Sequence, residues 1–309
     1  MLKFIAKQSY SQGFKRGLRR GFKEGHKRGK IIGSKGLVKL NLHIFDNYSN
    51  LYKESRRFAV KVNSASFKKY NPPSKLANQN ILSRGCLYKI GERAVILHNS
   101  ILSLCEDGWA SVTPIILRSL LECFMSSLVI AQKDSEYMAF KFYVHDDLNM
   151  MIDKNIAEEI ENFSRTQINQ LLKGLSSTDQ KRASKYVDDF LKRSEPKSYW
   201  YRPEYKDTKA ILNLCTEESG MPEAFRLFSM STHGTFLGSQ LFKDQPDETD
   251  INPRPDPQSI KIALAVSSSI LIEIASVRDQ FEKLGLDSEA QLMRDKKLKL
   301  RQPILDSIK

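Results

Sequence analysis

Residues 79–132 decide the fold class, and they read QNILSRGCLYKIGERAVILHNSILSLCEDGWASVTPIILRSLLECFMSSLVIAQ. Apolar residues recur at helical spacing over 79–106 and again over 109–132, and Asp107-Gly108 breaks the pattern between them. Two helices joined by so short a corner form an antiparallel αα-hairpin. We therefore predict two core helices here, and the second is the most apolar helix of the chain.

The rest of the chain follows the same helical period. No run of alternating β-branched residues bounded by hairpin turns is present, so strand signals are sparse. We expect a loop with Tyr199, Trp200 and Tyr201 at 194–203, and another at 243–258, which is acidic and rich in proline. The fold class is predicted to be all-α, an up-and-down helical bundle. Its other helices are expected at 37–62, 136–152, 154–174, 178–193, 206–217, 222–241 and 259–284.

The positive charge of the chain is concentrated at its N-terminus. Residues 1–36 hold eleven lysines and arginines against one acid, Glu24, so this arm carries +10 of the total of +13. Three parts are predicted: a basic arm at 1–36, a nearly neutral helical bundle at 37–286 and a charged, peripheral tail at 287–309.

The cysteines indicate a reducing compartment. Cys86, Cys105, Cys123 and Cys215 form no CxxC pair and lack metal-ligand spacing, so we predict buried, reduced thiols, no metal site, no cofactor and a cytoplasmic location. The apolar stretch 109–131 contains Arg118 and Glu122, each of which would cost several kcal/mol in a bilayer. A secretory signal and a membrane span are therefore not expected.

A glycine recurs at every fourth position of the basic arm from Gly13 to Gly33. A flexible, disordered tether is one interpretation. The other is a helix on which a second backbone packs closely, since a period of four keeps the glycines on one slowly rotating face. The repeat resembles the glycine-every-four helices of secretion-ATPase regulator proteins over about 21 residues. The glycines predicted to dock a partner are Gly13, Gly17, Gly21, Gly25 and Gly29, and the residues predicted to bind nucleic acid or a partner protein are Lys15, Arg16, Arg19, Arg20, Lys23, Lys27 and Arg28.

A polar string, RLFSMSTH, occupies residues 226–233 within the predicted helix 222–241. Seven residues make about two helical turns, so Arg226 and His233 would share a face roughly 10 Å apart along the axis, with Ser229 between them. A permanent guanidinium charge beside an imidazole that titrates near neutrality suits phosphodiester chemistry. The alternative is a helix whose Arg and His make only surface hydrogen bonds.

A second polar pair interrupts the apolar helix predicted at 109–132. In the segment LRSLLE, Arg118 and Glu122 lie four residues apart, so they share one helix face. Charges among apolar residues are costly unless they are paired. We therefore expect these two side chains to meet each other or another polar group.

The two motifs together carry a family resemblance. The RSLxE helix, the later SxxxHG helix that ends at Gly234 and the Tyr199-Trp200 loop resemble an uncharacterised bacterial helical family over residues 85–240. That family is similar to the HEPN superfamily, in which four to six residues separate an Arg from a later His, and six residues separate Arg226 from His233. Arg226 and His233 match the long form, although Leu227 stands where many HEPN motifs have a polar residue.

The resemblance implies a dimer with the motif helices at its interface, metal-independent RNA cleavage and a role in toxin–antitoxin or anti-phage defence. His233 would then act as general acid or base and Arg226 would stabilise transition-state charge, with support from Glu122, Arg118 and Ser229. A non-enzymatic interaction module is the alternative, in which Arg118, Glu122 and His233 form a buried polar network and the arm binds a partner protein or nucleic acid.

Overall fold

The computed structural model describes most of the chain from residue 37 onward. The described residues are 37–70, 81–106, 112–132, 134–152, 158–192, 199–214, 221, 225, 244–247, 250–255 and 257–308. Packing divides the chain into two units, residues 1–49 and 50–309. Of the first unit only the start of one helix is described, so the fold below is that of the second unit.

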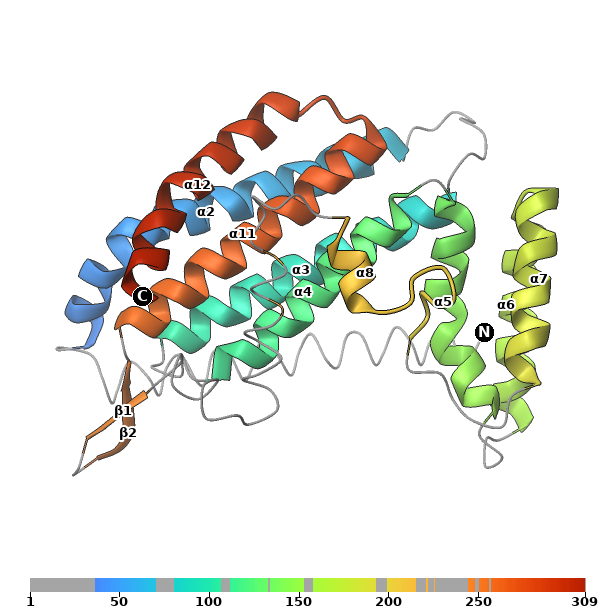
Figure 1. Cartoon of the computed structure of the whole chain (residues 1–309), viewed down its shortest axis with the longest axis horizontal. Helices are drawn as coiled ribbons and strands as arrows, with labels where there is room; N and C mark the ends of the chain where they lie inside the picture. Colours follow the sequence, from blue (N-terminus) through green and yellow to red (C-terminus); the bar gives the residue numbers. More distant parts are fainter. Residues whose placement is uncertain are drawn as a thin grey trace. The chain divides into compact units, whose positions relative to one another are not determined.

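Helices dominate the described residues, which confirms the all-α prediction (Figure 1). Their bounds are α2 Leu37–Tyr70, α3 Ile81–Glu106, α4 Thr113–Ile130, α5 Ser135–Ile152, α6 Glu158–Lys173, α7 Ser177–Leu191, α8 Thr208–Leu212, α11 Pro257–Glu282 and α12 Asp287–Ile308. Of the helix predicted at 222–241, only Phe225 is described, and it is helical and half-buried.

The core forms where α3, α4 and α11 pack on one another. The predicted αα-hairpin is confirmed as α3 and α4. It places Leu87, Ile101, Leu117 and Leu121 in the interior, with Ile270 of α11. The second helix begins at Thr113 rather than near 109, because Pro114 supplies the fixed φ that suits a first helical turn.

A buried ion pair links three helices in this core. Arg278 and Glu282 of α11 are both fully buried, with Nη2 and Oε1 3.2 Å apart. Arg278 also donates a hydrogen bond to Asn63 of α2, and its guanidinium lies 5.7 Å from the ring centre of Tyr88 on α3. Burial lowers the pKa of Arg278, and Glu282 works against that shift. Removing one partner of such a pair would strand a charge in the interior.

A second group of helices forms from α5, α6 and α7. Helix α7 begins at Ser176, whose hydroxyl accepts a hydrogen bond from the backbone N–H of Asp179 at 3.2 Å. Phe190 of α7 meets the edge of the His145 ring on α5, with ring centres 5.8 Å apart. The short helix α8 is capped in the same way by Asp207 and packs on α4.

Three predictions are wrong in detail. Helix α2 runs on past 62 to Tyr70, because Ser66 continues its buried face. The loop predicted at 243–258 contains an antiparallel hairpin of β1 Asp244–Asp247 and β2 Asp250–Pro255, held by backbone pairing. The tail predicted to be peripheral folds as α12 and packs along α11.

The reason for the third error is that charged residues hold α12 in place. Ala290 and Met293 are buried, but Lys297 is nearly buried as well, and its Nζ lies 2.7 Å from Glu273 of α11. Lys296 pairs with Glu54 of α2 at the same distance. A segment that looks solvent-facing by composition is therefore a packed helix.

Candidate functional site

The Arg118–Glu122 pair lies on the solvent side of α4. Arg118 Nε and Glu122 Oε1 are 3.4 Å apart, and the two side chains are 32% and 54% exposed. The expectation that these charges pair is confirmed. An exposed i,i+4 pair contributes only about 0.3–0.5 kcal/mol to stability. The pair is therefore not the buried network that the non-enzymatic alternative required of these two residues.

The face of α4 that carries this pair is open. Ile115, one turn before Arg118, is 60% exposed, and the hydroxyl of Ser119, next to Arg118, donates a hydrogen bond to the carbonyl of Ile115 at 3.4 Å. The opposite face is packed, since Leu117, Leu120 and Leu121 are completely buried. A cation and an anion are thus presented together on an accessible surface.

Most of the other residues named from the sequence lie outside the described residues. These are Arg226, Ser229 and His233 of the motif, and in the arm Gly13, Gly17, Gly21, Gly25 and Gly29 with Lys15, Arg16, Arg19, Arg20, Lys23, Lys27 and Arg28. Their chemistry therefore stays a prediction from sequence. Of the proposed catalytic residues, the structure places only Arg118 and Glu122.

A polar centre that the sequence did not predict surrounds Lys141 of α5. The Lys141 side chain is completely buried, and its ammonium donates to the carbonyl of Arg202 at 2.7 Å and pairs with the carboxylate of Glu204. The rings of Tyr137 and Tyr186 lie 5.6 and 4.9 Å from Nζ. These contacts give a buried cation both of its compensations, a carboxylate and aromatic faces.

Burial governs the titration of this centre. It lowers the pKa of Lys141, while Glu204 works in the opposite direction. One turn along α5, burial also lowers the pKa of His145, whose Nε2 lies 3.2 Å from Asn149 Nδ2. Because Lys141 has no exposed surface, it cannot reach a substrate from solution. Its contacts instead anchor the turn at 199–207 to α5.

Aromatic side chains complete that anchor. Trp200 meets Phe142 edge-on with ring centres 5.1 Å apart, and Tyr199 stacks on Tyr201 at 5.3 Å. The described part of the aromatic loop predicted at 194–203, residues 199–203, therefore packs against α5. A sequence signal for this centre did exist, since Lys141 stands alone in the apolar run YMAFKFYV.

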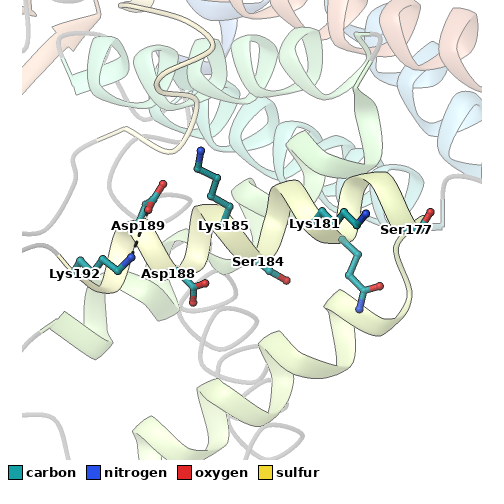
Figure 2. Close-up of a pocket in the computed structure, with 8 residues that line it drawn as sticks. Ser177, Lys181, Ser184, Lys185, Asp188, Asp189 and Lys192 are labelled. Atoms are coloured by element: carbon teal, nitrogen blue, oxygen red, sulfur yellow. Dashed lines mark ion pairs between the residues drawn. The ribbon is translucent and has the colours of Figure 1, made fainter.

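The surface hollow in Figure 2 follows α7. It is lined by polar and charged side chains of that one helix, with lysines beside aspartates, and Lys192 and Asp189 lie 4.0 Å apart. The hollow contains charges of both signs, so it does not match a uniformly charged ligand. Its lining residues are Ser177, Gln180, Lys181, Ser184, Lys185, Asp188, Asp189 and Lys192.

Cysteine and acidic residues form no evident metal centre in the described part of the chain. No group of three or more His, Cys, Asp or Glu residues there could hold a metal ion. Cys86, Cys105 and Cys123 are buried and in no disulfide, as predicted, and Cys215 lies outside the described residues. Burial raises the pKa of Cys86 to about 12 and that of Cys123 to about 11, so both stay protonated and unreactive near neutral pH.

Two described helices, α4 and Ser259–Glu282 of α11, are long and apolar enough to cross a membrane by length and composition. Most of each one is buried against other helices, which is also how core helices behave. This test alone therefore assigns neither helix to a bilayer.

Comparison with known families identifies the middle of the chain. Residues 92–249 match the model of a family of unknown function (DUF5677). The chain belongs to this family. The DUF5677 segment contains the Arg118–Glu122 pair, the Lys141 centre and the Arg226–His233 motif, whereas α2, α11 and α12 lie entirely outside it. No curated protein and no solved structure matches the chain. The predicted likeness to the HEPN superfamily stays a prediction.

Proposed function

We propose that the chain is a HEPN-like endoribonuclease, an effector of a bacterial toxin–antitoxin or anti-phage defence system. The observation that supports the proposal is the exposed Arg118–Glu122 pair of α4. An otherwise apolar helix presents a cation and an anion together on its solvent side, where the guanidinium could meet a phosphate. These residues and the Arg226–His233 motif fall in the same family segment.

The chemistry proposed is a transesterification within RNA. The ribose 2′-oxygen attacks the adjacent phosphorus while the bond from phosphorus to the 5′-oxygen breaks, giving a 2′,3′-cyclic phosphate and a free 5′-hydroxyl. His233 takes the proton of the 2′-hydroxyl or delivers one to the leaving 5′-oxygen. The protein itself supplies the acid, the base and a guanidinium for charge stabilisation, so the proposed step needs no metal ion.

Charge stabilisation falls to the arginines. Arg226 stabilises the negative charge that develops on the non-bridging oxygens in the transition state. Glu122 orients Arg118 or His233, and Ser229 donates a hydrogen bond to phosphate. Self-association through the segments 109–132 and 222–241 is part of the same proposal, as is binding of RNA or a partner protein by the basic arm.

The decisive experiment compares induced expression of the wild type with His233→Ala at matched protein levels. We expect growth arrest with the wild type and its loss in the variant, because removal of a general acid or base costs about a hundredfold or more in rate. Purified wild type should convert labelled RNA to fragments ending in 2′,3′-cyclic phosphate, in the presence of a chelator as well.

The matched control is Lys185→Ala, which removes an exposed charge of α7 far from the motif in sequence and should arrest growth like the wild type. Equal toxicity of His233→Ala and wild type would rule out nuclease chemistry at His233. Loss of RNA cleavage on addition of a chelator would rule out the metal-independent mechanism.

A further inference from the structure

Helix α2 presents a row of positively charged side chains to solvent, with one uncharged turn between Lys61 and Lys68. Lys53, Arg57, Lys61 and Lys68 follow one another at helical spacing on one face, with Arg56 beside them, and all five side chains are exposed. From Lys53 to Lys68 the row extends about 22 Å at 1.5 Å per residue. The name α2 stripe is used below for its four members Lys53, Arg56, Arg57 and Lys68.

The four charges of the α2 stripe are not neutralised by the fold. None of them forms an ion pair with another described residue, whereas Lys61 pairs with Glu289. Glu54 is the one acid of α2 between residues 50 and 70, and it pairs with Lys296 of α12. A row of like charges repels itself, so its presence without counter-charges favours an external anion as partner.

The opposite, apolar face of α2 packs in the protein core. Leu51, Phe58, Ala59 and Val62 are buried, and Tyr52 stacks on His98 of α3 with ring centres 4.2 Å apart. A helix that binds a membrane surface must insert an apolar face into the lipid. The apolar face of α2 is not free to insert, which argues against a lipid partner.

The exposed face of α2 also carries one aromatic ring. Phe67 is 56% exposed next to Lys68, and its ring centre lies 6.5 Å from that of Tyr88. Proteins that bind single-stranded nucleic acid combine a track of cations for the phosphates with exposed aromatic rings on which bases stack. The α2 stripe and Phe67 supply both elements.

The sign pattern separates a nucleic acid from an acidic protein. The α2 stripe contains no acid, as expected for a partner that repeats one charge along its length. The exposed face of α7 has the pattern of an ordinary solvated surface, where Asp188 and Asp189 follow Lys181 and Lys185 on the same helix (Figure 2). The two faces therefore differ in kind, although both carry several lysines.

We propose that the α2 stripe, with Phe67, binds the phosphate backbone of single-stranded RNA. This inference rests on the proposed ribonuclease function and gives it a substrate-binding surface on a helix that lies wholly outside the DUF5677 segment. Contacts to phosphate carry no sequence information, so α2 would hold RNA of any sequence.

The test measures RNA binding and cleavage separately. In the full-length chain with His233→Ala, which keeps the RNA intact, the variant Lys53→Gln, Arg56→Gln, Arg57→Gln and Lys68→Gln is titrated with a fluorescent 20-nucleotide oligouridylate. We expect an affinity loss of about tenfold or more at low salt. The slope of log affinity against log salt should fall by up to about 3, since each phosphate contact on a single strand adds about 0.7.

The matched control removes the same number of charges from α6 and α7 through Lys173→Gln, Lys181→Gln, Lys185→Gln and Lys192→Gln. We expect this protein to bind nearly as the unsubstituted one does. Equal losses in both variants would mean that only net charge matters, and wild-type binding by the α2 variant would mean that the stripe takes no part. Either result overturns the inference.

Two further measurements close the alternatives. If the α2 variant loses binding to phosphatidylserine vesicles but binds RNA as before, the partner of the stripe is a membrane and the inference is overturned. If the fourfold variant melts at a lower temperature, the milder double variant Lys53→Gln with Lys68→Gln is used instead. Its salt slope should fall by about 1.4, half the decrease expected for four contacts. If the wild-type chain, with native His233, binds RNA but does not cleave it, the proposed ribonuclease function is refuted. The inference that the α2 stripe binds RNA would remain supported.

Discussion

At the residue scale, the electrostatic behaviour of the core depends on which charged or titratable groups are buried. His98 is completely buried against Tyr52, and this burial lowers its pKa from about 6.5 to about 3, while Arg56 adds to the shift and a backbone group of Tyr52 opposes it. Lys141 and Arg278 are buried too, but each has a carboxylate partner. His98 must therefore stay neutral for the fold to persist.

We predict that this histidine makes the protein sensitive to mild acid. Below pH 6.5 the unfolded chain takes up a proton at His98 and the folded chain does not, so stability falls as pH drops from about 6.5 towards 3. The loss is at most about 1.4 kcal/mol per pH unit, or about 2 kcal/mol at pH 5. Denaturant unfolding at pH 7.5, 6 and 5 measures it.

The matched variant is His98→Phe, which keeps an aromatic ring against Tyr52 and removes the titrating group. Other acidic groups affect both proteins alike, so the difference between the two pH curves isolates His98. The curves should diverge below pH 6.5. Curves that stay parallel down to pH 5 would show that His98 does not titrate in this way.

At the scale of the helices, periodicity predicted contacts that are local and missed those that are not. The spacing of apolar residues in α3 and α4 was enough to predict the hairpin, and the i,i+4 spacing predicted the Arg118–Glu122 pair. Lys141 was missed because its partner Glu204 is 63 residues away. Helix α12 was missed for the same reason, since its lysines pair with Glu54 and Glu273 of distant helices.

The two strands β1 and β2 were not predicted, for a different reason. The hairpin β1–β2 is composed of Asp, Pro, Gln and Asn with little else, residue types that are depleted in strands. Only its backbone pairing, for example Asp247 with Asp250, defines it. A pattern of side chains cannot reveal a strand pair of this kind.

The packing of α3 against α11 depends on a missing side chain at Gly91. A Cβ there would lie 2.3 Å from Arg278 Nη1 and 2.9 Å from Asn63 Oδ1. Arg278 cannot easily retreat, because Asn63 and Glu282 hold its guanidinium. We predict that Gly91→Ala lowers the free energy of unfolding by about 1–3 kcal/mol through overpacking.

The control for this prediction is Gly85→Ala in the same helix. Nothing lies within 4 Å of a Cβ at Gly85, so alanine should add its helix propensity, up to about 1 kcal/mol, without a clash. Thermal or denaturant unfolding should move the two variants in opposite directions. If Gly91→Ala is as stabilising as Gly85→Ala, the buried guanidinium is not held as tightly as its contacts indicate.

At the scale of the whole molecule, positive charge is concentrated in two regions, the N-terminal arm and helix α2. The arm carries +10 by sequence, and the exposed cations of α2 form a second concentration of positive charge. The apolar surface is uneven too. Ile96 of α3 and Ile115 of α4 are each 60% exposed, and the latter lies one turn from Arg118. The α4 face, which combines exposed Ile115 with the Arg118–Glu122 pair, has the mixed apolar and polar character of a protein interface.

We predict self-association through that face, and specifically through the segment 109–132. Closed two-fold dimers are the commonest soluble assembly, and a stable one needs about 800 Å² buried on each partner. Light scattering at tens of micromolar should report a dimer for the wild type, without any added partner. Ile115→Lys should shift it to a monomer, because the lysine would place two like charges at a two-fold interface.

Ile81→Lys is the matched control. Ile81 is 63% exposed at the first residue of α3, and in an antiparallel hairpin this is the end away from Ile115, which lies near the start of α4. The same substitution there adds the same charge and removes the same apolar group, yet it should leave the dimer intact. A monomeric wild type at this concentration would exclude the α4 dimer, and so would equal effects of the two substitutions, because the response would then not depend on the face.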